Sequence, residues 1–115
     1  MMLSAAALGL MLAAAAPACV KDGAALTGRF EWQSLTRPNG KPIPAPYVLL
    51  DIPICIKSGE TVITSGLLRV YPRDAAMLQG LHEGDALLVI GRYKLPDDFK
   101  TLGDIAVYDA QLVRQ

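Results

Sequence analysis

The two cysteines, Cys19 and Cys55, are the side chains of this sequence best suited to chemistry. A zinc site needs three or four N, S or O ligands at suitable spacing, and the single histidine, His82, belongs to no such motif. A catalytic thiol needs an electropositive neighbourhood, and only Lys57 stands near Cys55. Three states stay open: a Cys19–Cys55 disulfide, an acylated Cys19 with a free Cys55, and a Cys55 that fills the core. We expect the disulfide, with no metal site and no cofactor.

The acidic residues raise the alternative of an enzyme. A nuclease needs clustered carboxylates for a metal ion and arginines for phosphate. Here the carboxylates are scattered as Glu31, Asp51 and Asp104, with one adjacent pair at Asp97 and Asp98. His82 in "LHEGD" is a lone candidate for a general base. Because no catalytic motif is present, we predict a protein that is not an enzyme, and a small hydrolase or nuclease is the alternative.

The first eighteen residues have the composition of an export signal. They read "MMLSAAALGLMLAAAAPA", carry no charged side chain and end in Ala16-Pro17-Ala18, an A-x-A cleavage pattern. We predict a signal peptide over residues 1–18 and a mature domain over residues 19–115, located in the periplasm or outside the cell. The alternatives are a retained membrane anchor and a lipoprotein acylated at Cys19, directly after the apolar run.

The charge of the chain narrows the choice of partners. Eleven Lys and Arg residues balance eleven Asp and Glu residues, so the chain is formally neutral. A neutral domain lacks the electrostatic attraction that nucleic acids and anionic membranes exert on basic proteins. The composition therefore argues against a nucleic-acid partner, and against a membrane unless Cys19 is lipidated.

Alternation of apolar and polar residues predicts five strands. The first, at 26–32, contains Gly28, which indicates a bend, and the second, at 47–56, contains Pro53, which indicates an edge or a bulge. One face of the second strand is aliphatic throughout: Val48, Leu50, Ile52, Ile54 and Ile56. The other strands are expected at 61–71, 86–93 and 104–113. A short helix is expected within 72–81, with Asp74 as its N-cap.

Residues 33–46, "QSLTRPNGKPIPAP", separate the first two strands. Because its prolines lack the N–H group that a strand ladder needs, we predict a long, stiff loop. Its part from Arg37 to Pro46 is a candidate contact element for a protein partner.

The order of three strands, a short helix and two strands predicts a small five-stranded Greek-key barrel like the OB-fold, with the helix between strands three and four. A β-sandwich is the rival, but it usually has more strands. Cys55 falls on the strand face opposite the aliphatic one, where the start of a mature chain could reach it. An oxidising compartment favours such a bond, which would close a loop of roughly 37 residues and stabilise the fold by about 4 kcal/mol.

The stretches "CVKDGAALTGRF", "YVLLDIPICI", "GLLRVYP", "GDALLVIGRY" and "DIAVYDA" resemble an uncharacterised OB-like domain family of bacterial secreted proteins. That family combines an early cysteine and "LxG" with a "PIC(I/V)" strand and a later "VxG" strand. Many of its members carry histidines in the loop after "VxG", and this sequence, with "GRYKLPDDFKTLG", has none there. The resemblance therefore implies the fold and export, and a metal or acid–base role based on those histidines does not carry over to this chain.

Ligand binding is the functional prediction that this fold supports. OB-like barrels bind on the face of strands two and three, between the loops that join strands one to two and four to five. Tyrosines beside arginines can stack on and pair with sugars, peptides or anionic groups. The candidate residues are Arg29, Tyr47, Arg69, Tyr71, Arg92 and Tyr93. We predict an exported binding module for a small ligand or an envelope protein, and the alternative is a tethered lipoprotein with a structural role.

Overall fold

Five strands and one short helix make up the described part of the chain. The computed structural model describes residues 19–36, 39–95 and 105–115, so the predicted signal peptide and Asp97, Asp98 and Asp104 lie outside the described residues. The elements are β1 (Ala25–Thr36), β2 (Pro42–Ser58), β3 (Thr61–Pro72), η1 (Ala75–Leu78), β4 (Ala86–Lys94) and β5 (Ile105–Arg114).

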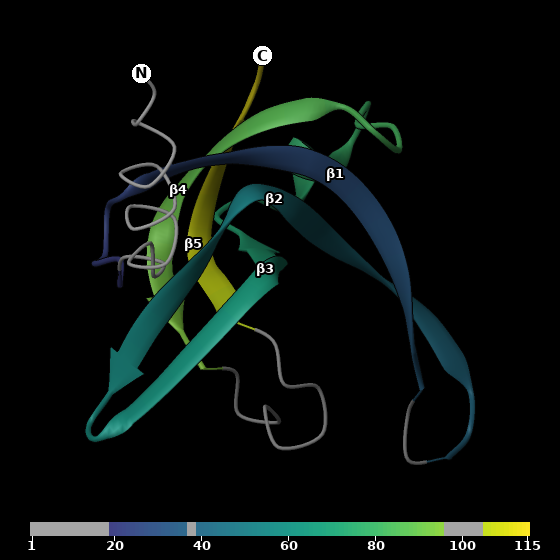
Figure 1. Cartoon of the computed structure of the whole chain (residues 1–115). Helices are drawn as coiled ribbons and strands as arrows, with labels where there is room; N and C mark the ends of the chain where they lie inside the picture. The colour runs from purple at the N-terminus through teal and green to yellow at the C-terminus, as the bar shows by residue number, and fades with distance from the viewer. Residues whose placement is uncertain (1–18, 37–38, 96–104) are drawn as a thin grey trace, which may run out of the picture.

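The strands form a closed barrel in the order β1-β2-β3-β5-β4 (Figure 1). All neighbouring strands are antiparallel except β3 and β5, which run parallel. The short helix lies between β3 and β4, and it is a 3-10 turn of four residues rather than an α-helix. Asp74 caps it by accepting a hydrogen bond from the Ala76 N–H at 2.9 Å. The predicted mainly-β class, the five-stranded barrel and the position of the helix are confirmed.

Alternate side chains of every strand fill the barrel. The fully buried ones include Phe30, Val48, Leu68, Leu87 and Ile105, which come from all five strands. Because successive side chains of a strand point to opposite faces, the residues between them face outward. This alternation places Arg69 and Tyr71 outside the barrel, since Leu68 and Val70 are buried.

A bulge interrupts β2 at Pro53. The pairing between β2 and β3 shifts between Leu49 and Ile54, as the proline indicates. Ile54 and Ile56 still reach the core, but Ile52 lies in the bulge with 73% of its surface exposed. The prediction of an unbroken aliphatic core face on this strand is therefore wrong at Ile52.

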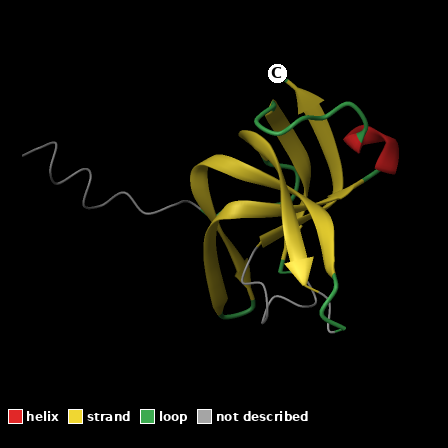
Figure 2. Cartoon of the chain, turned by 90° about the vertical axis from the view of Figure 1, so that its right-hand side faces the viewer, coloured by secondary structure: helices red, strands yellow, loops and turns green. Residues whose placement is uncertain are grey.

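The prediction of a loop at 33–46 is wrong over most of its length. β1 and β2 continue as paired strands to Thr36 and Pro42, and form an arm that extends from the barrel (Figures 1 and 2). We call residues 32–36 and 42–46 the arm. Its pairs include Trp32 with Pro46 and Ser34 with Pro44.

The prolines do not interrupt the arm because of the direction in which their nitrogens point. In an antiparallel pair, alternate residues direct their main-chain N–H and C=O groups toward the partner strand and away from it. The Phe30 N–H donates to the Asp85 C=O at 2.9 Å, so Phe30 and every second residue after it point away from β2. The residues opposite them, among them Pro42, Pro44 and Pro46, likewise point away from β1. Their missing N–H groups therefore remove no hydrogen bond from the β1–β2 ladder.

Candidate ligand-binding face

Two tyrosines and an arginine from neighbouring strands contact one another on the outside of the barrel. The rings of Tyr71 on β3 and Tyr108 on β5 stack with centroids 4.6 Å apart and an angle of 4° between their planes. The guanidinium carbon of Arg69 lies 5.0 Å from the centre of the Tyr71 ring, within the range of a cation–π contact.

Strand pairing brings these side chains together. In the parallel ladder Arg69 is the partner of Ala106 and Val70 the partner of Val107, so the outward residues of β3 stand beside those of β5. On the other side of β5, Arg92 of β4 is the partner of Tyr108. We call Arg69, Tyr71, Arg92 and Tyr108 the tyrosine–arginine cluster. It spans three strands that are far apart in the sequence.

A pocket adjoins the cluster on the β4 side. It has a volume of about 220 Å³, and its lining is Arg92, Lys94, Leu95 and Tyr108. Arg92 and Lys94 are exposed cations, and Tyr108 and Leu95 add apolar surface. Such a lining suits a ligand that combines an anionic group with a ring or an apolar face.

Three of the six predicted face residues do not belong to the exposed cluster. Arg29 is exposed on β1, and its Nη1 donates to the Gly84 C=O at 3.0 Å. Tyr47 is the strand partner of Arg69, but only 1% of its surface is exposed. Tyr93 belongs to the core, with 6% exposed, so its assignment to the outer face is wrong. The reason is that side chains two residues apart on a strand point to the same face. Tyr93 is four residues after Val89 and six after Leu87, both of which face inward, so Tyr93 faces inward too.

Tyr93 has a structural role inside the barrel. Its hydroxyl donates to the C=O of Ala24 at 2.5 Å and lies 3.2 Å from the C=O of Val89, and its N–H donates to Asp22 Oδ1 at 3.0 Å. Burial is the largest cause that raises the pKa of Tyr93 from 10.0 to about 12, and the charge of Asp22 adds to it. Tyr93 thereby fixes the segment before β1 to β4.

The raised pKa predicts a loss of stability in base. Because the folded-state pKa lies above the unfolded value, the contribution is intact below about pH 10 and is lost as the pH rises toward 12. Two pKa units correspond to up to about 3 kcal/mol. Urea unfolding should show that the free energy of unfolding falls more between about pH 8 and about pH 11 in the wild type than in Tyr93→Phe. The variant lacks the hydroxyl hydrogen bonds, so it should be less stable by about 1 kcal/mol at both pH values. An equal decrease in both proteins would contradict this assignment.

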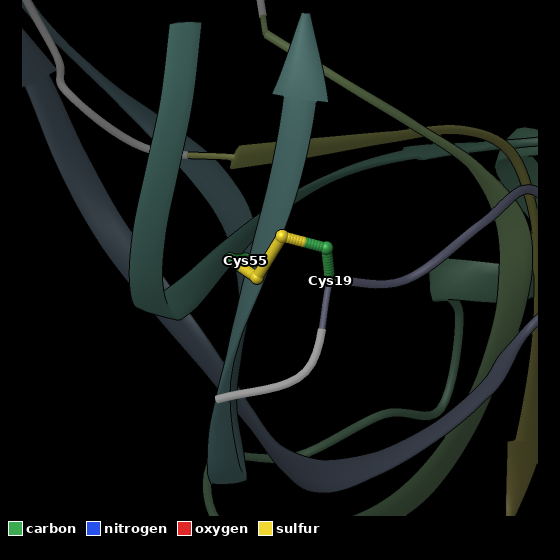
Figure 3. The surroundings of a disulfide bond; sticks show 2 residues. All are labelled: Cys19 and Cys55. Atoms are coloured by element: carbon green, nitrogen blue, oxygen red, sulfur yellow. A yellow bond between two sulfur atoms is a disulfide. The ribbon is translucent and has the colours of Figure 1, made fainter. Parts of the chain in front are cut away.

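Cys19 and Cys55 form a disulfide, as predicted (Figure 3). Cys55 is 4% exposed between the buried Ile54 and Ile56, and the Val20 N–H donates to the Cys55 C=O at 2.8 Å. The start of the described chain thus lies along β2 next to its bulge. A sulfur atom in a disulfide has no valence for a thioether, so the disulfide and an acylated Cys19 exclude each other. The bond is compatible with an extracellular or periplasmic location.

The residues considered for catalysis lie apart within the described chain. Glu31 accepts a hydrogen bond from Gln33 Nε2 at 2.5 Å, and Asp51 is exposed in the bulge region. His82 is exposed, with its Nδ1 3.8 Å from Asp85 Oδ2. In residues 19–36, 39–95 and 105–115, no three His, Cys, Asp or Glu side chains come close enough to hold a metal ion.

Tyr108, Lys94 and Leu95 are the members of the site that are absent from the sequence prediction. The alternation in "DIAVYDA" carries a signal for Tyr108, because it places this residue on the face opposite Val107. That Tyr108 lies beside Tyr71 could not be inferred, since parallel pairing of β3 with β5 leaves no local trace in the sequence.

No protein-family model matches this chain, and no curated protein or solved structure is similar enough to be matched. The described residues contain no helix with the length and apolar character needed to cross a membrane.

Proposed function

We propose that this protein is an exported, non-enzymatic binding module of the OB-fold type, and that the tyrosine–arginine cluster binds an anionic ligand. The observation that carries the proposal is the contact of stacked Tyr71 and Tyr108 with Arg69, next to the pocket lined by Arg92 and Lys94. The ligand class is an acidic sugar, in which a carboxylate pairs with the cations and the pyranose face packs on a tyrosine.

The strand order supports the OB-fold assignment. Five strands close into one barrel, and the short helix joins β3 to β4, as in that fold. The cluster begins on β3, one of the two strands whose outer face OB barrels use for binding. It lies on the β5 side of β3 rather than on the β2 side, because Tyr47 on β2 is buried and Tyr108 on β5 stacks on Tyr71.

Export is supported by the disulfide and by the sequence before it. A bond between Cys19 and Cys55 forms and persists in oxidising compartments. The apolar run at 1–18 ends in an A-x-A pattern directly before Cys19. We propose cleavage after Ala18 and a mature domain of residues 19–115.

A titration with a defined probe tests the binding site. Tetragalacturonate added to the ¹⁵N-labelled, oxidised protein should shift the amide resonances of β3, β4 and β5 around the cluster. Arg92→Gln should weaken binding by about tenfold or more, because a charged hydrogen bond is lost. Affinity for the wild type should fall with salt, since the pairing is electrostatic.

Two controls make the titration specific. Lys57→Gln removes the same charge from an exposed position near the end of β2 and should leave the affinity unchanged. A neutral galactose tetrasaccharide should bind much more weakly. The proposed site would be contradicted if the neutral sugar bound as tightly as tetragalacturonate, or if Arg92→Gln and Lys57→Gln lost the same affinity. Resonance shifts confined to strands other than β3, β4 and β5 would also contradict it.

A further inference from the structure

One edge of the arm carries main-chain groups without a strand partner. Ser34 and Thr36 follow Phe30 at even spacing, so their N–H and C=O groups point away from β2. β4 pairs with β1 only from Ala25 to Arg29. Just before β4, the main chain of residues 84 and 85 forms hydrogen bonds with the main chain of Phe30. The Trp32 N–H donates to Glu83 Oε1 at 2.6 Å. Beyond Trp32, no described strand pairs with this edge, which we call the arm edge.

The opposite edge of the arm is closed to strand addition. Pro42, Pro44 and Pro46 occupy the positions of β2 that point away from β1, and none of them has an N–H group to donate. Prolines at such positions are a known protection of sheet edges. The arm therefore offers a partner strand one edge and not two.

The arm edge is complementary to itself. When two copies run antiparallel across a two-fold axis at Leu35, Ser34 of each stands opposite Thr36 of the other. Each such pair exchanges two N–H···O=C bonds, so the N–H and C=O groups of both residues are all satisfied. Glu83 on the Trp32 N–H marks the end of the pairing and need not move. Because the second edge is blocked by prolines, this contact gives a closed dimer rather than a growing sheet.

Charge and apolar surface fit the same arrangement. The two-fold axis places the tip of one arm, with exposed Lys41, against the base of the other, with exposed Glu83. Trp32 is 41% exposed beside the arm edge. It lines a mainly apolar pocket of about 340 Å³ together with Ser34, Pro42 and Pro44. We propose that the arm edge is a homodimer interface in which β1 of one copy pairs with β1 of a second.

The single tryptophan of the chain, Trp32, reports directly on this interface. Sedimentation velocity of the oxidised protein over a concentration series should show a monomer–dimer equilibrium. Over the same series, Trp32 emission should shift to shorter wavelength and become less accessible to acrylamide, because the tip of the partner arm covers the ring. A protein that stays monomeric over the whole soluble range overturns the proposal, as does dimer formation without any change at Trp32.

Two variants at one position separate the main chain from the side chain. Ser34→Pro removes a main-chain donor that points away from β2 and has no strand partner among the described residues, so the barrel should keep its circular dichroism and its melting temperature. Its dimer should be weakened about tenfold or more, since two symmetric hydrogen bonds are lost. Ser34→Ala keeps the N–H and should dimerise like the wild type. Dimers that persist in Ser34→Pro, or that disappear equally in Ser34→Ala, overturn strand pairing at the arm edge.

Discussion

Reduction of the Cys19–Cys55 disulfide is expected to lower the free energy of unfolding by about 4 kcal/mol. The two cysteines are 36 residues apart, and the loop between them contains all of β1 and most of β2. In the chain-entropy model, the bond restricts this segment in the unfolded chain. A small domain has a total stability of about 5–15 kcal/mol, so the loss is a large share of it. The reduced protein should also lose order at Cys19 and Val20, which the disulfide ties to β2. Asp22 and Ala24 should stay bonded to Tyr93.

Urea unfolding of three samples tests this expectation. They are the oxidised wild type, the reduced wild type and Cys19→Ser. Cys19 is exposed and Cys55 is buried, so Cys19→Ser removes the bond and leaves the buried thiol in place without a cavity. The reduced wild type and Cys19→Ser should agree within about 1 kcal/mol and both lie far below the oxidised protein. Equal midpoints for the oxidised and reduced wild type would show that the bond does not stabilise the fold.

Burial made the barrel predictable from the sequence. Inward residues such as Phe30, Val48 and Leu68 must be apolar, and the strand period of two places them at alternate positions. The order of the strands and the place of the short helix then left few alternatives for so short a chain. The disulfide could be predicted for a different reason, because the apolar composition of residues 1–18, an even cysteine count and the strand position of Cys55 all favoured it.

Hydrogen-bond direction was not predictable in the same way. The sequence at 42–46 contains three prolines, and whether they interrupt a ladder depends on which side of the strand their nitrogens face. That side is set by the register of β1 against β2, in which Ser34 is the partner of Pro44. A change of register by one residue would have made each proline disruptive. The exposure of Ile52 has a similar origin, since the bulge at Pro53 is set by pairing with β3.

The candidate site was predictable only in part. The alternation within β3 was enough to place Arg69 and Tyr71 on the outer face. Their neighbour Tyr108 comes from a strand about 37 residues later, and parallel pairing between the two strands is a property of the fold as a whole. The phase of Tyr93 with Val89 indicates the core, whereas its residue type is typical of ligand contacts, and the structure follows the phase.

Gly28→Ala is expected to lower the free energy of unfolding by about 3 kcal/mol, the upper part of the usual range for overpacking. A Cβ atom at Gly28 would lie 2.6 Å from Val48 Cγ1 and would also overlap the Leu49 carbonyl oxygen. The oxygen belongs to the main chain of the paired strand, so it cannot rotate away as a flexible side chain does. The sequence indicated a bend at this glycine, and the structure shows the reason: β1 and β2 approach each other here more closely than any side chain permits.

Gly66→Ala is the matched control for this substitution. Gly66 also lies in a strand and has no positive φ, and a Cβ there would meet only Pro53 Cγ, at an ordinary contact distance of 3.8 Å. The same chemical change should therefore be neutral, or stabilising by up to about 1 kcal/mol, because alanine restricts the unfolded chain. Urea unfolding of the two oxidised variants against the wild type measures the difference. If Gly28→Ala were as stable as Gly66→Ala, the close approach of β1 and β2 would not be what selects glycine, and the curvature of the barrel at this point would need another cause.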